Sequence, residues 1–134
     1  PVRSVAMEKT AAKQLSPLAL AFLGDAVFEL YVREKLLLQG NAPAQQLHRK
    51  AVGYVCARAQ SKAVEEIAGL LSPDEESVYR RGRNAHSRPP KNADVADYRR
   101  ATGLEALFGY LHLCGETDRA RDLFQVIWGD SPKE

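Results

Sequence analysis

The chain has 134 residues, which leaves room for one compact domain and excludes an enzyme with separate substrate and cofactor domains. With 45% hydrophobic and 27% charged residues and a net charge of +2, it has the composition of an ordinary globular protein. Two cysteines are too few for a disulfide framework or a four-thiolate zinc site. No secretory signal or membrane-spanning stretch is recognisable, so we expect no membrane partner and a cytoplasmic location.

Composition and helix-boundary signals predict an all-α fold. Alanine and leucine together number 35 against 12 for isoleucine and valine, which favours helices over strands. Ser16-Pro17 is a typical helix start and Gly40-Asn41 a typical stop, and they bound the first predicted helix. About six helices are expected, over residues 17–39, 43–53, 55–70, 72–82, 94–115 and 116–128.

These helices are expected to form one domain over residues 15–129, preceded by an extension (1–14) that could be flexible and followed by a tail (130–134). The tandem prolines Pro89-Pro90 place a loop over residues 84–92, because proline is not tolerated in a helix interior. Residues 79–100 carry seven basic and two acidic residues, whereas the rest of the chain carries twelve basic and fifteen acidic ones. This basic block indicates either a polyanion-binding surface or a solvated arginine-rich loop.

Two acidic residues lie in apolar helical stretches. Asp25 lies in the most apolar part of the first helix, and Glu105 lies between two glycines in the fifth. Burying a lone carboxylate is costly, so each must be paired, protonated or bound to a cation. Two such acids on distant helices are expected either to bind one cation together or to hold an arginine each. Glu29, one turn after Asp25, is expected to pair with Arg33.

The residues around both acids carry a resemblance to the ribonuclease III family. Phe-Leu-Gly-Asp-Ala-Val at residues 22–27 resembles the signature helix of that family, and Glu-Ala-Leu-Phe-Gly at residues 105–109 resembles its second acidic motif. The similarity is closer to the Mini-ribonuclease III subfamily, which has the catalytic domain and no double-stranded-RNA-binding domain. The segments that carry it are residues 18–33, 47–52, 57–60, 81–85 and 101–111.

The resemblance implies a hydrolase, an endoribonuclease that cuts double-stranded RNA with Mg²⁺, for which Mn²⁺ could substitute. It places Asp25 and Glu105 as the catalytic, metal-binding acids. Carboxylate oxygens suit these ions, and a metal ion can neutralise phosphate charge and activate water. The resemblance also implies a bacterial enzyme of ribosome biogenesis that matures the 23S ribosomal RNA precursor, with a large-subunit ribosomal protein as a further partner.

The chain departs from the wider family at three acidic positions. Leu18 and Ala21 stand where the family has glutamates, and Thr102 stands where its second motif opens with aspartate. The chain therefore has fewer carboxylates at these motifs than the wider family, and the number of metal ions that protein ligands hold stays open. Thr102 could hold a metal-bound water or be an ordinary helix hydroxyl.

Phe22 could be either a core aromatic residue or, as the resemblance implies, a contact in a homodimer that pairs through the first helix. The residues expected to contact RNA lie in or beside the basic block, because arginines and amides suit the phosphates and 2′-hydroxyls of A-form RNA. They are Arg81, Arg83, Asn84, Arg88 and Lys91. Part of the 81–84 segment could instead form ion pairs that hold the two acids in place.

Two alternative functions remain open at this stage. The first is a catalytically silent RNA-binding or ribosome-assembly module with the same fold, which the presence of both acids disfavours. The second is a helical interaction domain with a buried ion-pair core, which would explain the acids but not the arginine-rich loop.

Overall fold

The computed structural model describes residues 6–129, and within that range it contains helices and no strands, as the composition predicts. The six expected helices correspond to α2 to α7, with a 3₁₀-helix, η1, after α4. In chain order the elements are α1 (Lys9–Gln14), α2 (Pro17–Gln39), α3 (Ala44–Val55), α4 (Ala57–Ile67), η1 (Ala68–Leu70), α5 (Pro73–Arg83), α6 (Val95–Leu113) and α7 (Thr117–Trp128). No helix in this range combines the length and apolar character that crossing a bilayer requires.

Part of the segment expected as an N-terminal extension is packed against the domain. It forms α1, in which Ala12 is fully buried, and the Met7 N–H donates to the Leu113 carbonyl at 2.7 Å. A six-residue helix with no side-chain cap gives no sequence signal, and tertiary contacts hold it in place. Residues 1–5 and the tail at 130–134 lie outside the described residues.

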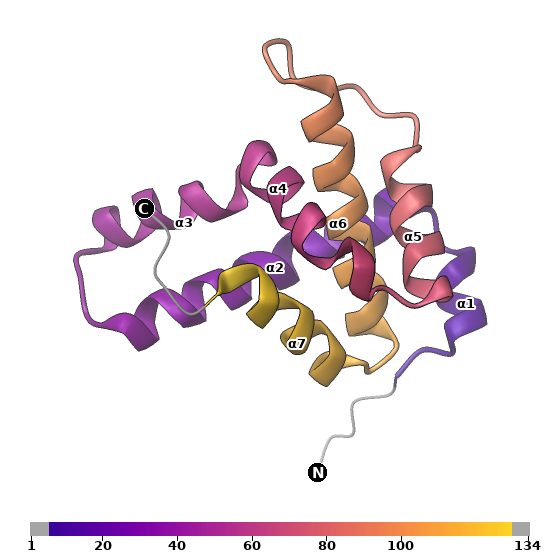
Figure 1. Ribbon diagram of the computed structural model, residues 1–134, viewed down its shortest axis with the longest axis horizontal. Helices are drawn as coiled ribbons and strands as arrows, with labels where there is room; N and C mark the ends of the chain where they lie inside the picture. The colour runs from indigo at the N-terminus through magenta and orange to yellow at the C-terminus, as the bar shows by residue number, and fades with distance from the viewer. Residues whose placement is uncertain (1–5, 130–134) are drawn as a thin grey trace.

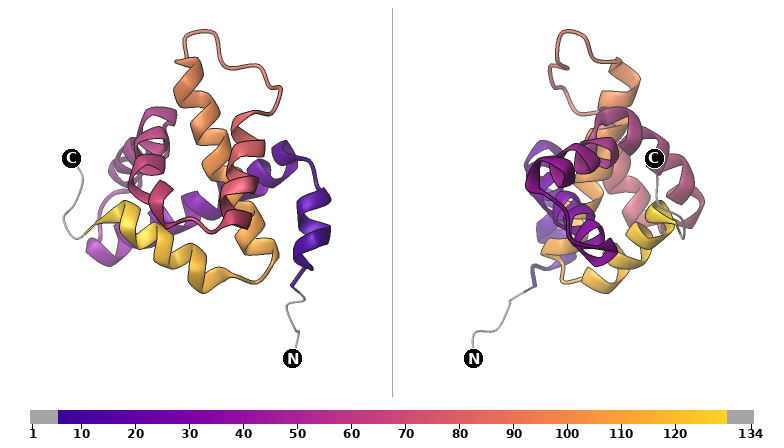
Figure 2. Two further views of the ribbon diagram at one scale, coloured as in Figure 1. Left: turned by 45° about the vertical axis from the view of Figure 1, so that its right-hand side comes forward. Right: turned by 90° about the vertical axis from the view of Figure 1, so that its left-hand side faces the viewer.

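The core is organised around α6, which contacts α2, α4 and α5 (Figure 1, Figure 2). Between Ala101 and Leu111 every residue of α6 except Glu105 is buried, so neighbours cover this helix on all sides. Phe28 of α2 makes edge-to-face contacts with Phe108 of α6 and Phe124 of α7, at centroid distances of 5.4 and 5.3 Å. Three helices thus share one aromatic cluster.

Two glycines set the crossing of α2 and α6. A Cβ atom added at Gly24 would lie 1.6 Å from the Glu105 carbonyl oxygen, and one added at Gly109 would lie 2.0 Å from the Leu20 carbonyl oxygen. Only glycine allows the two backbones to approach this closely. The crossing brings residues 25 and 105, about 80 positions apart in the chain, to the same place.

The helix ends follow the predicted capping chemistry. Ser16 Oγ accepts from the Ala19 N–H at 3.0 Å at the start of α2, and Ser72 forms a capping box with Glu75 at the start of α5. The α3–α4 junction lies at Cys56, whose extended backbone ends one helix and begins the next. The loop between α5 and α6 carries the tandem prolines and projects beyond the helices (Figure 1).

Candidate active site

Asp25 and Glu105 meet where α2 crosses α6, and we refer to them as the acid pair. The two carboxyl groups interact through charge and through hydrogen bonding. Glu105 is partly buried, whereas Asp25 is exposed. The expectation that Asp25 is embedded is therefore wrong for residues 6–129, because no other described residue covers the side of α2 that carries Phe22, Asp25 and Ala26.

The environment of the acid pair favours retention of a proton. Burial, and secondarily the negative charge and hydrogen bonding of Asp25, raise the pKa of Glu105 to about 8. Protonated Glu105 can donate a hydrogen bond to the Asp25 carboxylate. At neutral pH the pair therefore holds a proton between two carboxyl groups, and a cation bound there would replace that proton.

Gln60 of α4 is a third polar side chain at this site, and sequence reasoning missed it. The Gln60 amide lies close enough to the Glu105 carboxyl to lower the pKa of Glu105, against the larger effect of burial. Gln60 is 2% exposed, and its Nε2 makes no well-aligned hydrogen bond within residues 6–129. Residues 57–60 are among the segments that carry the family resemblance. Gln60 itself was not predicted as a site residue, because a neutral amide in a helix gives no charge signal.

The donor set of the acid pair fits Mg²⁺ or Mn²⁺. Carboxylate oxygens are hard ligands of the kind these ions prefer. Within residues 6–129 no three His, Cys, Asp or Glu side chains gather into a metal-binding group. The described residues thus offer two carboxylates, and the other coordination positions would be left to water and to oxygen atoms of a substrate.

Two nearby polar side chains are occupied elsewhere. Glu29 Oε1 accepts a hydrogen bond from Arg33 Nη2 at 2.7 Å, which confirms the expected pair. Thr102 Oγ1 donates to the Tyr98 carbonyl at 3.0 Å, so it is an ordinary helix hydroxyl in this structure. Neither side chain enlarges the acid pair.

Among the five residues predicted to bind RNA, Arg81 makes structural contacts. Its Nη1 donates to the Lys13 carbonyl at 2.6 Å, and its Nη2 lies 3.4 Å from the Leu15 carbonyl. These bonds connect α5 to the end of α1. The bonded residues lie far apart in the chain, so sequence reasoning could not anticipate the contact. Arg81 therefore has a role in the fold, whatever else it contacts.

The other four predicted residues lie at the end of α5 and in the projecting loop. Arg83 Nε donates to Asn84 Oδ1 at 3.2 Å. Arg88 and Lys91 are exposed and have no side-chain hydrogen bond or ion pair with any described residue. Their charges are therefore available to a ligand.

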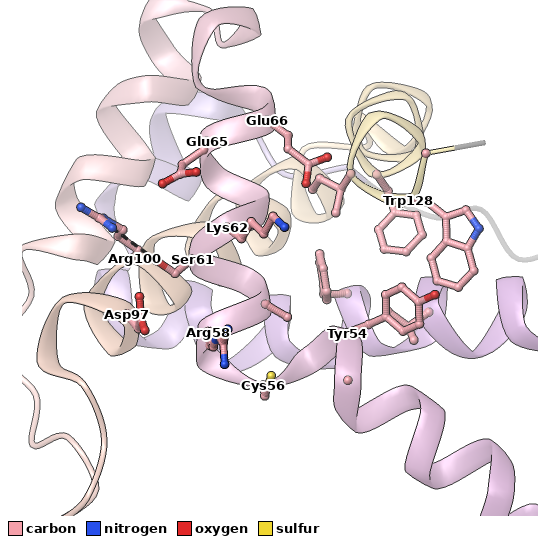
Figure 3. A pocket seen from close by; sticks show the side chains of 17 residues that line it. Tyr54, Cys56, Arg58, Ser61, Lys62, Glu65, Glu66, Asp97, Arg100 and Trp128 are labelled. Atoms are coloured by element: carbon pink, nitrogen blue, oxygen red, sulfur yellow. Dashed lines mark hydrogen bonds between the residues drawn. The ribbon is translucent and has the colours of Figure 1, made fainter. Parts of the chain in front are cut away.

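A separate groove lies along α4, between α3, α6 and α7 (Figure 3). Tyr54 stacks on Trp128 at its apolar end, with ring centroids 4.4 Å apart. Neither member of the acid pair lines it. Its charged side chains are three basic and three acidic ones: Arg58, Lys62, Arg100, Glu65, Glu66 and Asp97. Because these charges balance, the groove does not attract a polyanion through net charge.

The helical fold and the acid pair agree with what the chain matches among known proteins. It matches the family model described as the ribonuclease III domain over residues 18–116, a range that includes both acids. The chain therefore belongs to the ribonuclease III family of endoribonucleases, hydrolases whose substrate is RNA.

Sequence relatives and a solved structure indicate which members of this family the chain resembles. The chain is 47% identical over 121 residues to Mini-ribonuclease 3 of Thermoanaerobacter sp. (strain X514), covering 90% of this chain and 85% of that protein. It is 48% identical over 114 residues to Mini-ribonuclease 3 of Enterococcus faecalis, covering 83% and 86%. An X-ray structure of a protein from Fusobacterium nucleatum is 30% identical, with a TM-score of 0.77 and coverage of 84% and 87%. The resemblance to Mini-ribonuclease III is thereby confirmed.

Proposed function

We propose that the chain hydrolyses phosphodiester bonds of double-stranded RNA with a divalent cation, Mg²⁺ or Mn²⁺, held by Asp25 and Glu105. The observation that carries the proposal is the acid pair, in which a glycine-permitted helix crossing holds two carboxyl groups together against their mutual repulsion. Such an arrangement is costly for stability alone and is typical of a cation site. The similarity to proteins named Mini-ribonuclease 3 supports the same chemistry.

The two acids have different tasks in this proposal. Glu105, which is partly buried, releases its proton when the site is loaded, and Asp25, which is exposed, faces the side from which an RNA strand can approach. A bound divalent cation supplies charge neutralisation at the phosphate and a water molecule of lowered pKa. The Gly24–Gly109 crossing fixes the two helix backbones, so the carboxylates need little rearrangement.

The projecting loop supports a duplex RNA as the substrate. Arg88 and Lys91 are exposed there with no partner among the described residues, and Arg83 and Asn84 lie at the end of the preceding helix. A-form RNA is recognised mainly through phosphates and 2′-hydroxyls, which suit such side chains.

An exposed apolar stripe on α2 supports a homodimer. Phe22 is 83% exposed, with Leu18 and Leu30 at 40% and 52%. Together with the exposed Ala26, these residues recur at intervals of four along one helix, the spacing of a contact surface. A two-fold dimer through this surface would present two acid pairs to the two strands of a duplex.

The similarity to Mini-ribonuclease 3 proteins of bacteria extends the proposal to a natural substrate. We infer a cytoplasmic role in the maturation of the 23S ribosomal RNA precursor, with a large-subunit ribosomal protein on the substrate as a further partner.

Cleavage of a long RNA duplex, with and without Mg²⁺, tests the proposed activity. Wild-type protein should cleave only with the cation, and Asp25→Asn and Glu105→Gln should each lose cleavage while retaining RNA binding. Glu29→Gln, on the same helix, is the matched control and should cleave as wild type does. Wild-type cleavage by either acid-pair variant would remove that residue from the chemistry. Binding without cleavage by wild-type protein would favour the catalytically silent module.

A further inference from the structure

Gln60 has a buried amide group, Nε2, that makes no well-aligned hydrogen bond within residues 6–129. Its side chain is 2% exposed, and Nε2 carries two N–H donors with no well-aligned acceptor among the described residues. Buried polar groups in native proteins are almost always hydrogen-bonded, so an exception of this kind calls for a reason. The rest of the buried face of α4 includes Ala63, Val64 and Ile67, beside which an apolar side chain could pack.

The position of Gln60 supplies that reason. α4 packs on α6, and the amide lies beside the Glu105 carboxyl. Nε2 can donate hydrogen bonds and cannot bind a cation, so its natural partner here is a carboxylate oxygen. The amide is therefore placed to hold one oxygen of the Glu105 carboxyl.

We propose that Gln60 is a positioning residue of the acid pair, whose amide donates to one oxygen of Glu105 and so turns the other toward the cation. The inference rests on the proposed function, because it requires the acid pair to bind a divalent ion. Carboxylates that hold metal ions are commonly oriented by a hydrogen-bond partner, and loss of that partner weakens metal binding. Asp25 comes from α2, Glu105 from α6 and Gln60 from α4, so the assembled site requires three helices.

Binding of Mn²⁺ without RNA tests the inference, with electron paramagnetic resonance reporting the free ion. Gln60→Leu keeps the approximate size of the side chain and removes its donors, and should weaken Mn²⁺ binding by about tenfold or more. Ser61→Ala is the matched control, since Ser61 is the neighbouring buried polar residue and lies against Arg100 instead. It should bind Mn²⁺ as wild type does. In cleavage assays, raising the Mn²⁺ concentration should restore the rate of Gln60→Leu but not that of Asp25→Asn.

The outcomes separate this inference from the proposed function. If wild type and Asp25→Asn bind Mn²⁺ equally, the proposed cation site is wrong. If Asp25→Asn loses Mn²⁺ while Gln60→Leu binds it as tightly as wild type, the role of Gln60 is wrong. Should Gln60→Leu fail to fold, Gln60→Met decides, because this unbranched side chain of similar size also lacks the donors and should reduce the rise in unfolding temperature that Mn²⁺ produces. A rise equal to that of wild type would overturn the inference.

Discussion

Glu105 keeps its proton to a higher pH in the folded chain than in the unfolded one. Its pKa is raised from 4.5 to about 8, first by burial and then by Asp25. Between these values the folded state binds more protons than the unfolded state, so the stability contributed by this group falls as the pH rises. The loss begins near the unfolded pKa and is complete above pH 8.

Glu105→Gln should therefore stabilise the protein at high pH when divalent cations are chelated. The variant should unfold at nearly the wild-type temperature at pH 5 and several degrees higher above pH 8, a gain of about 1–3 kcal/mol. Thermal unfolding across this pH range measures the difference. Glu29→Gln, which removes an acid paired with Arg33, should show no gain that grows with pH. A difference for Glu105→Gln that stays constant with pH would contradict the raised pKa.

At the residue scale, sequence reasoning found the acids and missed their surroundings. Asp25 and Glu105 stood out because charges are rare in apolar helices. The exposure of Asp25 was not predictable, because α2 is apolar on nearly all sides and the pattern does not reveal which side lacks a neighbour within the chain. Gln60 carries no charge, so only its burial beside Glu105 identifies it.

The crossing of α2 and α6 is the element on which the acid pair depends. Gly24→Ala would place a methyl group 1.6 Å from the Glu105 carbonyl oxygen, so the helices must separate. We expect a loss of about 3 kcal/mol or more in the free energy of unfolding, together with loss of cleavage. Denaturant unfolding and the duplex assay measure both.

Gly53→Ala is the matched control for this prediction. Gly53 also lies inside a helix, but nothing is within 4 Å of an added Cβ atom. This variant should gain about 0.5–1 kcal/mol from helix propensity. Equal effects of the two substitutions would show that the crossing does not need a glycine.

An ion pair joins the start of α5 to α7. The Glu75 carboxylate accepts two hydrogen bonds of 2.9 Å from Arg119, and it also accepts from the Ser72 N–H at 2.8 Å. These contacts, the Arg119 hydrogen bond foremost, lower the pKa of Glu75. Its stabilisation is therefore present above the unfolded pKa and is lost as the pH falls into the acid range.

Glu75→Gln should destabilise the protein by about 1–3 kcal/mol at pH 7, and the difference from wild type should shrink in acid. Urea unfolding at both pH values measures it. Glu116→Gln, which breaks an exposed pair with Lys9, should cost less than about 1 kcal/mol. A cost for Glu75→Gln as small as that of the control would contradict a structural role for the pair.

At the element scale, the helices with strong end signals were predicted best. Ser16-Pro17 and Gly40 fix both ends of α2, which has the predicted bounds. The last turn of the third predicted helix (55–70) tightens into η1. The helix α1 was not predicted, because tertiary contacts hold it, including the bonds from Arg81 to the Lys13 and Leu15 carbonyls. Such contacts between distant segments leave no local pattern.

The projecting loop and α5 should respond differently to charge removal. Lys91→Gln and Arg88→Gln should weaken duplex binding and lower the slope of log affinity against log salt by about 0.9 or less per lost phosphate contact. Neither should change the unfolding temperature. Arg81→Gln should instead lower it, because two carbonyls lose their donor. An unchanged salt slope for both loop variants would exclude them from the RNA contact.

The stripe on α2 predicts the state of the whole molecule in solution. Light scattering on the purified chain should give twice the mass of one chain, and Phe22→Asp should give the mass of a monomer, because a charge there opposes burial of the stripe. Leu38→Asp is the control, since Leu38 is also exposed, at 80%, but lies at the other end of α2 and on another side. It should remain dimeric. A monomeric wild-type chain would contradict the proposed pairing.

Anomalous scattering from a crystal soaked in Mn²⁺ tests most directly whether two helices here build one cation site. We expect a peak in contact with both the Asp25 and the Glu105 carboxylates, and no such peak in Glu105→Gln. Manganese bound to only one of these acids, or found elsewhere with none at the acid pair, would contradict the shared cation site.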